Sequence, residues 1–228
     1  MLKILKIPLL SLFCFVVLLF STAKADEFPS DPNTELWKDT KVDHFNGKDD
    51  QYFSQKYYIN ATSWDEEGGV IMFYLGNEAG LSGPSQFGYL LELAEKHKAL
   101  LVSCEHRFYG DSIPNNNMSS SNLQYLTVEQ AMADFSDFIT FFNKAYLSDM
   151  TSERRWFVFG RSYGGALSSW FRIEYPYLSK GSLSSSGVVN SVLWYSEFDE
   201  NTYEVISPIC SQTIRQINSA FEQLGLIY

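Results

Sequence analysis

The chain has 228 residues, of which 45% are hydrophobic and 16% aromatic, and this is enough apolar material for a packed core. The formal net charge of -10 comes without any basic run, which argues against nucleic acid or an anionic membrane as a partner. The acidity by itself identifies no substrate.

The first 25 residues have the three parts of a secretory signal peptide. Lys3 and Lys6 form a positive start, residues 7–20 are an apolar run, and Ala23-Lys24-Ala25 supplies the small-x-small cleavage pattern. The apolar run is shorter than the about 20 residues that a membrane span requires, so no stable membrane anchor is expected. We therefore predict cleavage after Ala25 and a mature protein of the secretory pathway, lysosomal or extracellular.

Sequons and cysteines fit that compartment. Asn60-Ala61-Thr62 and Asn117-Met118-Ser119 predict glycosylation at Asn60 and Asn117. Cys104 ends an apolar run and is expected to be a buried, reduced thiol. Cys210 lies in a polar tail, where an oxidising compartment favours pairing, yet the sequence offers no evident partner for it.

Strand and helix patterns alternate after residue 26. Short β-rich runs predict strands, and amphipathic runs predict helices between them. The predicted strands cover residues 51–59, 69–76, 99–104 and 155–159, the predicted helices 86–98, 127–146 and 166–175, and a loop 105–122. This alternation is typical of an α/β fold with a mainly parallel sheet.

The helix near residue 127 has the clearest signals. Thr127 and Gln130 have the spacing of a capping box. Apolar residues recur at intervals of three and four and predict one buried face, namely Val128, Ala131, Met132, Phe135, Phe138, Ile139, Phe142 and Tyr146.

The segment "GRSYG", residues 160–164, has the G-x-S-x-G pattern of a nucleophile elbow. A predicted strand precedes it, a predicted helix follows it, and small residues surround it, as a tight strand-to-helix turn requires. We interpret Ser162 as a nucleophile and the Tyr163 amide as an oxyanion donor. The alternative is an ordinary serine in a tight turn.

A second oxyanion donor is expected from the loop after an earlier central strand. The glycine-bracketed segment "GNEAG", residues 76–80, follows the predicted strand 69–76. Asn77 or Glu78 would present a backbone amide there, although a plain turn between strand and helix explains the segment equally well.

Four segments in this order carry a resemblance: "GNEAG", "CEHRFYGDSIP" (104–114), "LTVEQAMADF" (126–135) and "GRSYGGALSSWFRIEYP" (160–176). From residue 42 onward the chain resembles the secreted and lysosomal prolyl serine exopeptidases. The resemblance implies an α/β-hydrolase domain with an inserted helical cap, short peptides cut beside proline as substrates, and Ser162 as nucleophile. It also allows a homodimer. Arg161 and Ala79 depart from the glycines usual in that family.

Candidates for the remaining triad members are poor. The three histidines, His44, His97 and His106, all precede Ser162, whereas this fold places the base after the nucleophile. Asp199 falls where the resembled family enters its cap. We therefore expect the acid and the base beyond Tyr228, with residues 26–195 as the N-terminal part of the hydrolase domain and 196–228 as the start of the cap.

Three functions remain open on sequence grounds. The first is a serine exopeptidase of which this chain is a part. The second is a non-catalytic short family member that binds peptides or regulates. The third, an esterase or lipase, fits the four segments less well. No metal site and no cofactor are expected, and the 228-residue chain alone is expected to be inactive and poorly soluble, because missing strands would leave apolar edges exposed.

Overall fold

The structure is a computed structural model that describes residues 25–48, 50–84, 88–151 and 153–225. The predicted signal peptide therefore lies outside the described residues except for Ala25. The chain divides into two compact units, the first ending at Val189 and the second beginning at Asn190.

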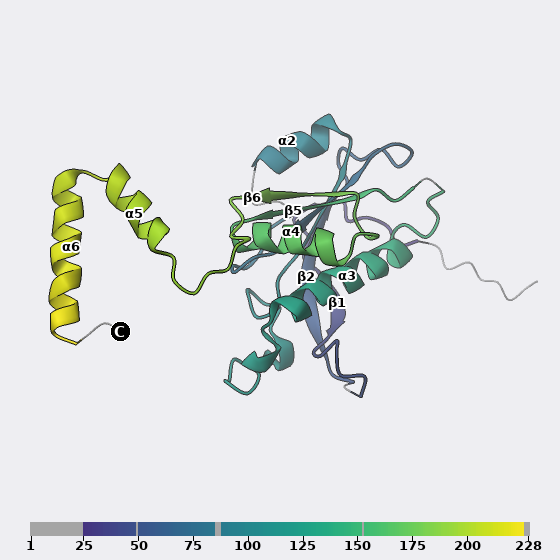
Figure 1. The fold of residues 1–228 in the computed structure, drawn as a ribbon. Coiled ribbons are helices and arrows are strands. Elements are labelled where there is room, and N and C mark those ends of the chain that lie inside the picture. Colours follow the sequence, from purple (N-terminus) through teal and green to yellow (C-terminus); the bar gives the residue numbers. More distant parts are fainter. Residues whose placement is uncertain (1–24, 49, 85–87, 152, 226–228) are drawn as a thin grey trace, which may run out of the picture. The chain divides into compact units, whose positions relative to one another are not determined.

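The first unit is built on a six-stranded sheet in the order β1-β2-β4-β3-β5-β6 (Figure 1). Its strands are β1 (Leu36–Lys41), β2 (Tyr52–Asn60), β3 (Ile71–Leu75), β4 (Leu100–Cys104), β5 (Trp156–Arg161) and β6 (Gly181–Ser185). The pairs β1–β2 and β2–β4 are antiparallel, and the other three pairs are parallel. The predicted α/β class with a mainly parallel sheet is confirmed.

Helices cover both faces of the sheet, because the central strands are apolar on both sides. Alternate residues of β3 enter different clusters: Phe73 packs with α3 (Val128–Ala145) and α4 (Tyr163–Glu174), whereas Tyr74 packs with α2 (Gly88–Lys96). Figure 1 shows α2 on one side of the sheet and α3 and α4 on the other.

Two strands have no counterpart among the predictions. The buried side of β1 is polar, since Lys38 and Thr40 face inward and the Lys38 ammonium donates to Thr40 Oγ1 at 3.1 Å. Strand β6, "GSLSS", has no β-branched or aromatic residue. Neither strand shows the apolar pattern that predicts strands, and pairing with a neighbour specifies both.

The start of α3 corrects one prediction. Thr127 Oγ1 accepts from the Gln130 amide at 3.2 Å, which is one half of the capping box. The Gln130 side chain does not complete it, because its oxygen accepts from the His44 amide at 3.0 Å and its amide group donates to Asp43 at 2.7 Å. The helix start is thereby tied to the segment after β1.

The second unit is a pair of helices, α5 (Ser196–Val205) and α6 (Pro208–Gln223). Ser207 caps α6 by accepting from the Cys210 amide, and Arg215 lies 4.0 Å from the centre of the Tyr203 ring. Neither helix has a buried residue. Within the described ranges of the whole chain, no helix has the length and apolar character that crossing a membrane requires.

Candidate active site

Ser162 lies at a strained turn between β5 and α4. Its backbone has φ 56° and ψ −127°, a region that residues with a side chain rarely occupy. The Ser162 amide donates to Ser185 O at 3.0 Å, and the Ser162 carbonyl accepts from the amides of Gly165 and Ala166. The helix begins at Tyr163, three residues earlier than predicted, because Ser162 alone makes the turn.

The glycines around the turn are required by close backbone contacts. A Cβ on Gly160 would lie 1.8 Å from Gly164 O, and a Cβ on Gly165 would lie 2.9 Å from Ser185 O. Strand β5, the first turn of α4 and the end of β6 therefore approach too closely for side chains. This is the steric condition that a nucleophile elbow imposes.

The structure brings the predicted oxyanion loop beside Ser162. A Cβ on Gly164 would lie 3.1 Å from Leu75 O and 3.3 Å from Asn77 Cβ, so the loop after β3 packs on the first turn of α4. The Ser162 hydroxyl donates to Glu78 Oε1 at 3.3 Å. The segment "GNEAG" predicts only a backbone role for Glu78, whereas in the structure the Glu78 carboxylate faces the serine.

His106 is fully buried and both of its ring nitrogens are engaged. Nδ1 lies 2.6 Å from Arg107 O and Nε2 lies 3.0 Å from the Tyr163 hydroxyl. A carbonyl can only accept, so Nδ1 is assigned the proton and Nε2 accepts from Tyr163. Burial lowers the pKa of His106. This histidine therefore has no free nitrogen for Ser162.

Glu105, directly before it, is also fully buried. Its Oε1 accepts from the Leu81 amide at 2.8 Å, and its Oε2 accepts from the Asp111 amide, the Ser112 amide and the Ser112 hydroxyl at 3.0, 3.0 and 2.6 Å. Lys56 Nζ lies 3.5 Å from Oε1. The carboxylate thus anchors the end of the loop that contains Asn77 and Glu78.

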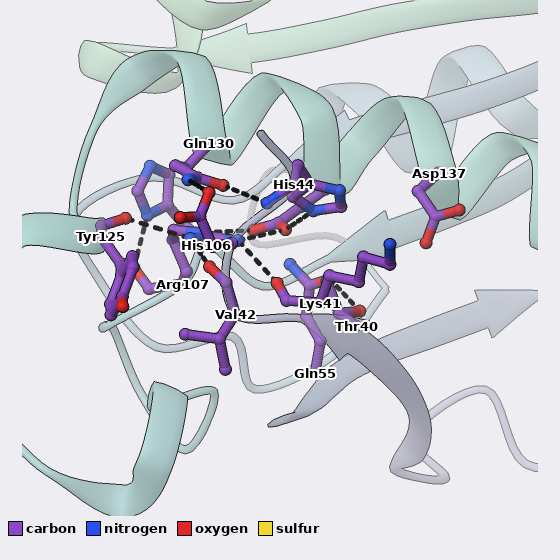
Figure 2. A network of polar contacts seen from close by, with 12 residues as sticks. Thr40, Lys41, Val42, His44, Gln55, His106, Arg107, Tyr125, Gln130 and Asp137 are labelled. Carbon is purple, nitrogen blue, oxygen red and sulfur yellow. Dashed lines mark hydrogen bonds and ion pairs between the residues drawn. The ribbon is translucent and has the colours of Figure 1, made fainter. Parts of the chain in front are cut away.

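Arg107 completes this buried run, and Figure 2 shows the network around it. Its guanidinium donates twice to Asp134, at 2.7 and 2.6 Å, and also donates to the carbonyls of Lys41, Val42 and Tyr125. Burial raises the pKa of Asp134, but the adjacent Arg107 charge and hydrogen bonds outweigh burial and leave that pKa lowered. The pair is a structural brace.

The other candidate triad residues have different surroundings. His44 Nε2 lies 2.7 Å from Asp134 Oδ1, so its ring belongs to the Arg107 network. His97 is exposed just beyond α2, and Asp199 is exposed in the first turn of α5, in the second unit. His44 and His106 therefore have partners other than Ser162.

The two departures from the resembled family are both exposed. Arg161 ends β5 without a positive φ, so a side chain is tolerated there, and Ala79 lies in the loop after β3. A hollow of about 490 Å³ adjoins Arg161 on the α2 side of the sheet, lined in part by Tyr74, Phe159 and Leu183. In the described part of the chain, no group of three or more His, Cys, Asp or Glu side chains could hold a metal.

Both sequon asparagines accept a hydrogen bond from the backbone two residues further along the chain. Asn60 Oδ1 accepts from the Thr62 amide at 3.0 Å, and Asn117 Oδ1 accepts from the Ser119 amide at 2.8 Å. Each side chain thus bonds the residue that carries the sequon hydroxyl. Asn117 is exposed and Asn60 half-buried at the end of β2.

The chain is similar to the members of one protein family. The model of the family described as serine carboxypeptidase S28 matches residues 40–227. The chain is 37% identical over 197 residues to a probable serine protease of Arabidopsis thaliana, covering 84% of this chain and 40% of that protein. It is 36% identical over 195 residues to lysosomal Pro-X carboxypeptidase of Bos taurus, covering 81% and 39%.

The chain thus spans about 40% of the length of the curated relatives that it matches. Among solved structures, prolyl oligopeptidase B of Galerina marginata aligns with a TM-score of 0.48 at 15% identity, covering 69% of this chain and 21% of that one. A likeness at this level identifies no activity.

Proposed function

Because this chain belongs to the serine carboxypeptidase S28 family, we propose that the whole protein is a serine peptidase with Ser162 as its nucleophile. One observation carries the proposal. Ser162 occupies a strained backbone conformation at the tip of β5, between the loop after β3 and the first turn of α4. Strain of this kind persists where the surrounding structure imposes it, and it is concentrated at active sites.

The proposed reaction is acyl transfer. Ser162 Oγ attacks the peptide carbonyl, its proton passes to a histidine, and the developing oxyanion receives hydrogen bonds from the Tyr163 amide and from the Asn77 or Glu78 amide. The peptide C–N bond then breaks, the histidine gives the proton to the leaving amine, and water releases the acyl group from Ser162. We propose that the histidine and its aspartate come from the part of the protein that the relatives have beyond the matched stretch.

The relatives named Pro-X carboxypeptidase support a finer proposal for this chain. Its substrates would be short peptides cleaved beside proline, its compartment would be lysosomal or extracellular, and Asn60 and Asn117 would carry glycans. A family-type homodimer is part of the same proposal, as are a hydrolase part over residues 26–195 and a cap that begins at 196.

A phosphonate probe tests the nucleophile. We expect the full-length protein to be labelled at Ser162, and we expect Ser162→Ala to abolish both labelling and hydrolysis of proline-containing reporter peptides. Ser148→Ala, at an exposed serine in a loop, is the matched control and should label normally. Labelling that survives Ser162→Ala would contradict the proposal. A parallel assay of the 228-residue chain and the full-length protein would show whether residues after Tyr228 are needed for activity.

A further inference from the structure

Two consecutive buried residues reach the two sides of the proposed oxyanion site. Glu105 accepts from the Leu81 amide at 2.8 Å and so anchors the loop after β3. His106 Nε2 lies 3.0 Å from the hydroxyl of Tyr163, the residue directly after the nucleophile. The residues directly after β4 therefore contact both segments that would supply oxyanion donors.

We propose that His106 is a positioning residue that holds Tyr163, and with it the first amide of α4, at the distance from the loop after β3 that the oxyanion requires. This inference rests on the proposed function. It gives His106 a task different from that of a catalytic base, because the residue acts through Tyr163 and touches no reacting atom.

The geometry around the ring supports a fixed orientation. The His106 ring lies 5.2 Å from the Tyr109 ring, 5.4 Å from the Tyr163 ring and 6.3 Å from the Phe135 ring, measured between centres. Its Nδ1 is held by Arg107 O, and Arg107 is itself fixed by Asp134. The Nε2 acceptor is thus attached to α3 through a chain of buried contacts.

The polarity of this hydrogen bond also matters. A neutral ring with its proton on Nδ1 accepts from the Tyr163 hydroxyl, whereas a protonated ring would donate from both nitrogens and reverse the direction of this hydrogen bond, since a hydroxyl can also accept. Burial lowers the pKa of His106, so the accepting form persists below the pH at which an exposed histidine becomes charged.

Four variants of the full-length protein test the role by kinetics. Tyr163→Phe removes only the hydroxyl, and His106→Phe removes the Nε2 acceptor, together with the Nδ1 donor to Arg107 O, while keeping a ring. Because a displaced Tyr163 amide would stabilise the oxyanion less well, we expect each single variant to lower kcat about tenfold and to keep KM within about twofold. The double variant should be no worse than either single one, and His106→Gln, which restores an acceptor oxygen, should recover part of kcat.

Tyr109→Phe is the matched control, since it removes a hydroxyl from another ring that packs on His106. We expect it to retain kcat. Unchanged kcat in Tyr163→Phe and His106→Phe, or strictly additive losses in the double variant, would overturn the inference.

Nitrogen-15 NMR of the histidine side chains gives a readout that does not need activity. We expect His106 to be neutral and protonated on Nδ1, with an Nε2 shift that changes in Tyr163→Phe and not in Tyr109→Phe. A proton on Nε2, or an Nε2 shift indifferent to Tyr163→Phe, would overturn the contact even if the enzyme cleaves no reporter. A silent enzyme with the expected NMR result would instead count against the proposed function.

Discussion

The loops that follow β3 and β4 each carry a glutamate, and the two carboxylates have opposite surroundings. Glu105, after β4, is fully buried and accepts four hydrogen bonds. Glu78, after β3, is exposed, and it accepts from the Ser162 hydroxyl at 3.3 Å. A buried carboxylate that accepts from three backbone amides and a hydroxyl supports the fold, whereas one beside a nucleophile and open to solvent can meet a substrate.

We expect the largest effect on stability from breaking the buried ion pair between Arg107, in the loop after β4, and Asp134 in α3. Asp134→Leu leaves the Arg107 guanidinium buried without its carboxylate, and such a change destabilises a protein by about 3–5 kcal/mol. Urea unfolding of the variant should show this loss as a lower midpoint. Glu153→Gln, which removes the exposed partner of Lys180, is the control and should leave the midpoint almost unchanged.

Glu105→Gln should have the next largest effect on stability. The neutral side chain has one oxygen in place of two, and its NH2 group would face amide donors that now bond to the carboxylate. We expect a loss of about 1–3 kcal/mol in the free energy of unfolding. An unfolding midpoint equal to that of the unchanged protein would show that the β4 loop does not depend on this charge.

The pH dependence of stability should distinguish two buried groups, His106 in the loop after β4 and Asp134 in α3. The pKa values of His106 and Asp134 are both lowered in the folded state, from ordinary values of 6.5 and 3.8. A lowered folded pKa means that the unfolded chain binds protons first, so stability falls as the pH falls. We expect a first decline below about pH 6.5 and a second below about pH 4. Urea midpoints measured across this range would show both, and His106→Gln should remove only the first.

Glu78→Gln should have the smallest effect on stability, within about 0.5 kcal/mol, because its side chain is exposed. Its effect should appear in reactivity, since the variant changes the charge beside Ser162 Oγ, and the rate of phosphonate labelling measures this. A loss of stability as large as that of Glu105→Gln would abolish the contrast between the two loops.

Much of the framework was predictable because its strands are apolar on both faces. The apolar runs predict β3, β4 and β5, and the apolar stripe predicts α3, each with the right type and nearly the right bounds. Strands β1 and β6 were not predictable from an apolar pattern. The inward-facing residues of β1 are Lys38 and Thr40, which are polar, and β6 is rich in serine. Long-range pairing, which no local pattern encodes, specifies them.

The site was predictable to a similar extent. The glycine pattern indicated the turn at Ser162, and the structure supplies its backbone conformation. The contact of Ser162 with Glu78 and the hydrogen bond between His106 and Tyr163 join residues 84 and 57 positions apart. Such contacts depend on how β3, β4 and β5 are ordered in the sheet. Three consecutive polar residues directly after a buried strand, residues 105–107, were the one signal that this loop would be buried.

Chemical modification of Cys104 would report when the central sheet opens. The thiol is free, lies at the end of β4 with no exposed surface, and has its pKa raised well above the ordinary value by burial. Thiol reagents attack the thiolate of an accessible cysteine, so Cys104 should be modified when the central sheet separates. Exposed Cys210 should react at once. A slow second phase of modification would therefore time the opening of the sheet without any added label.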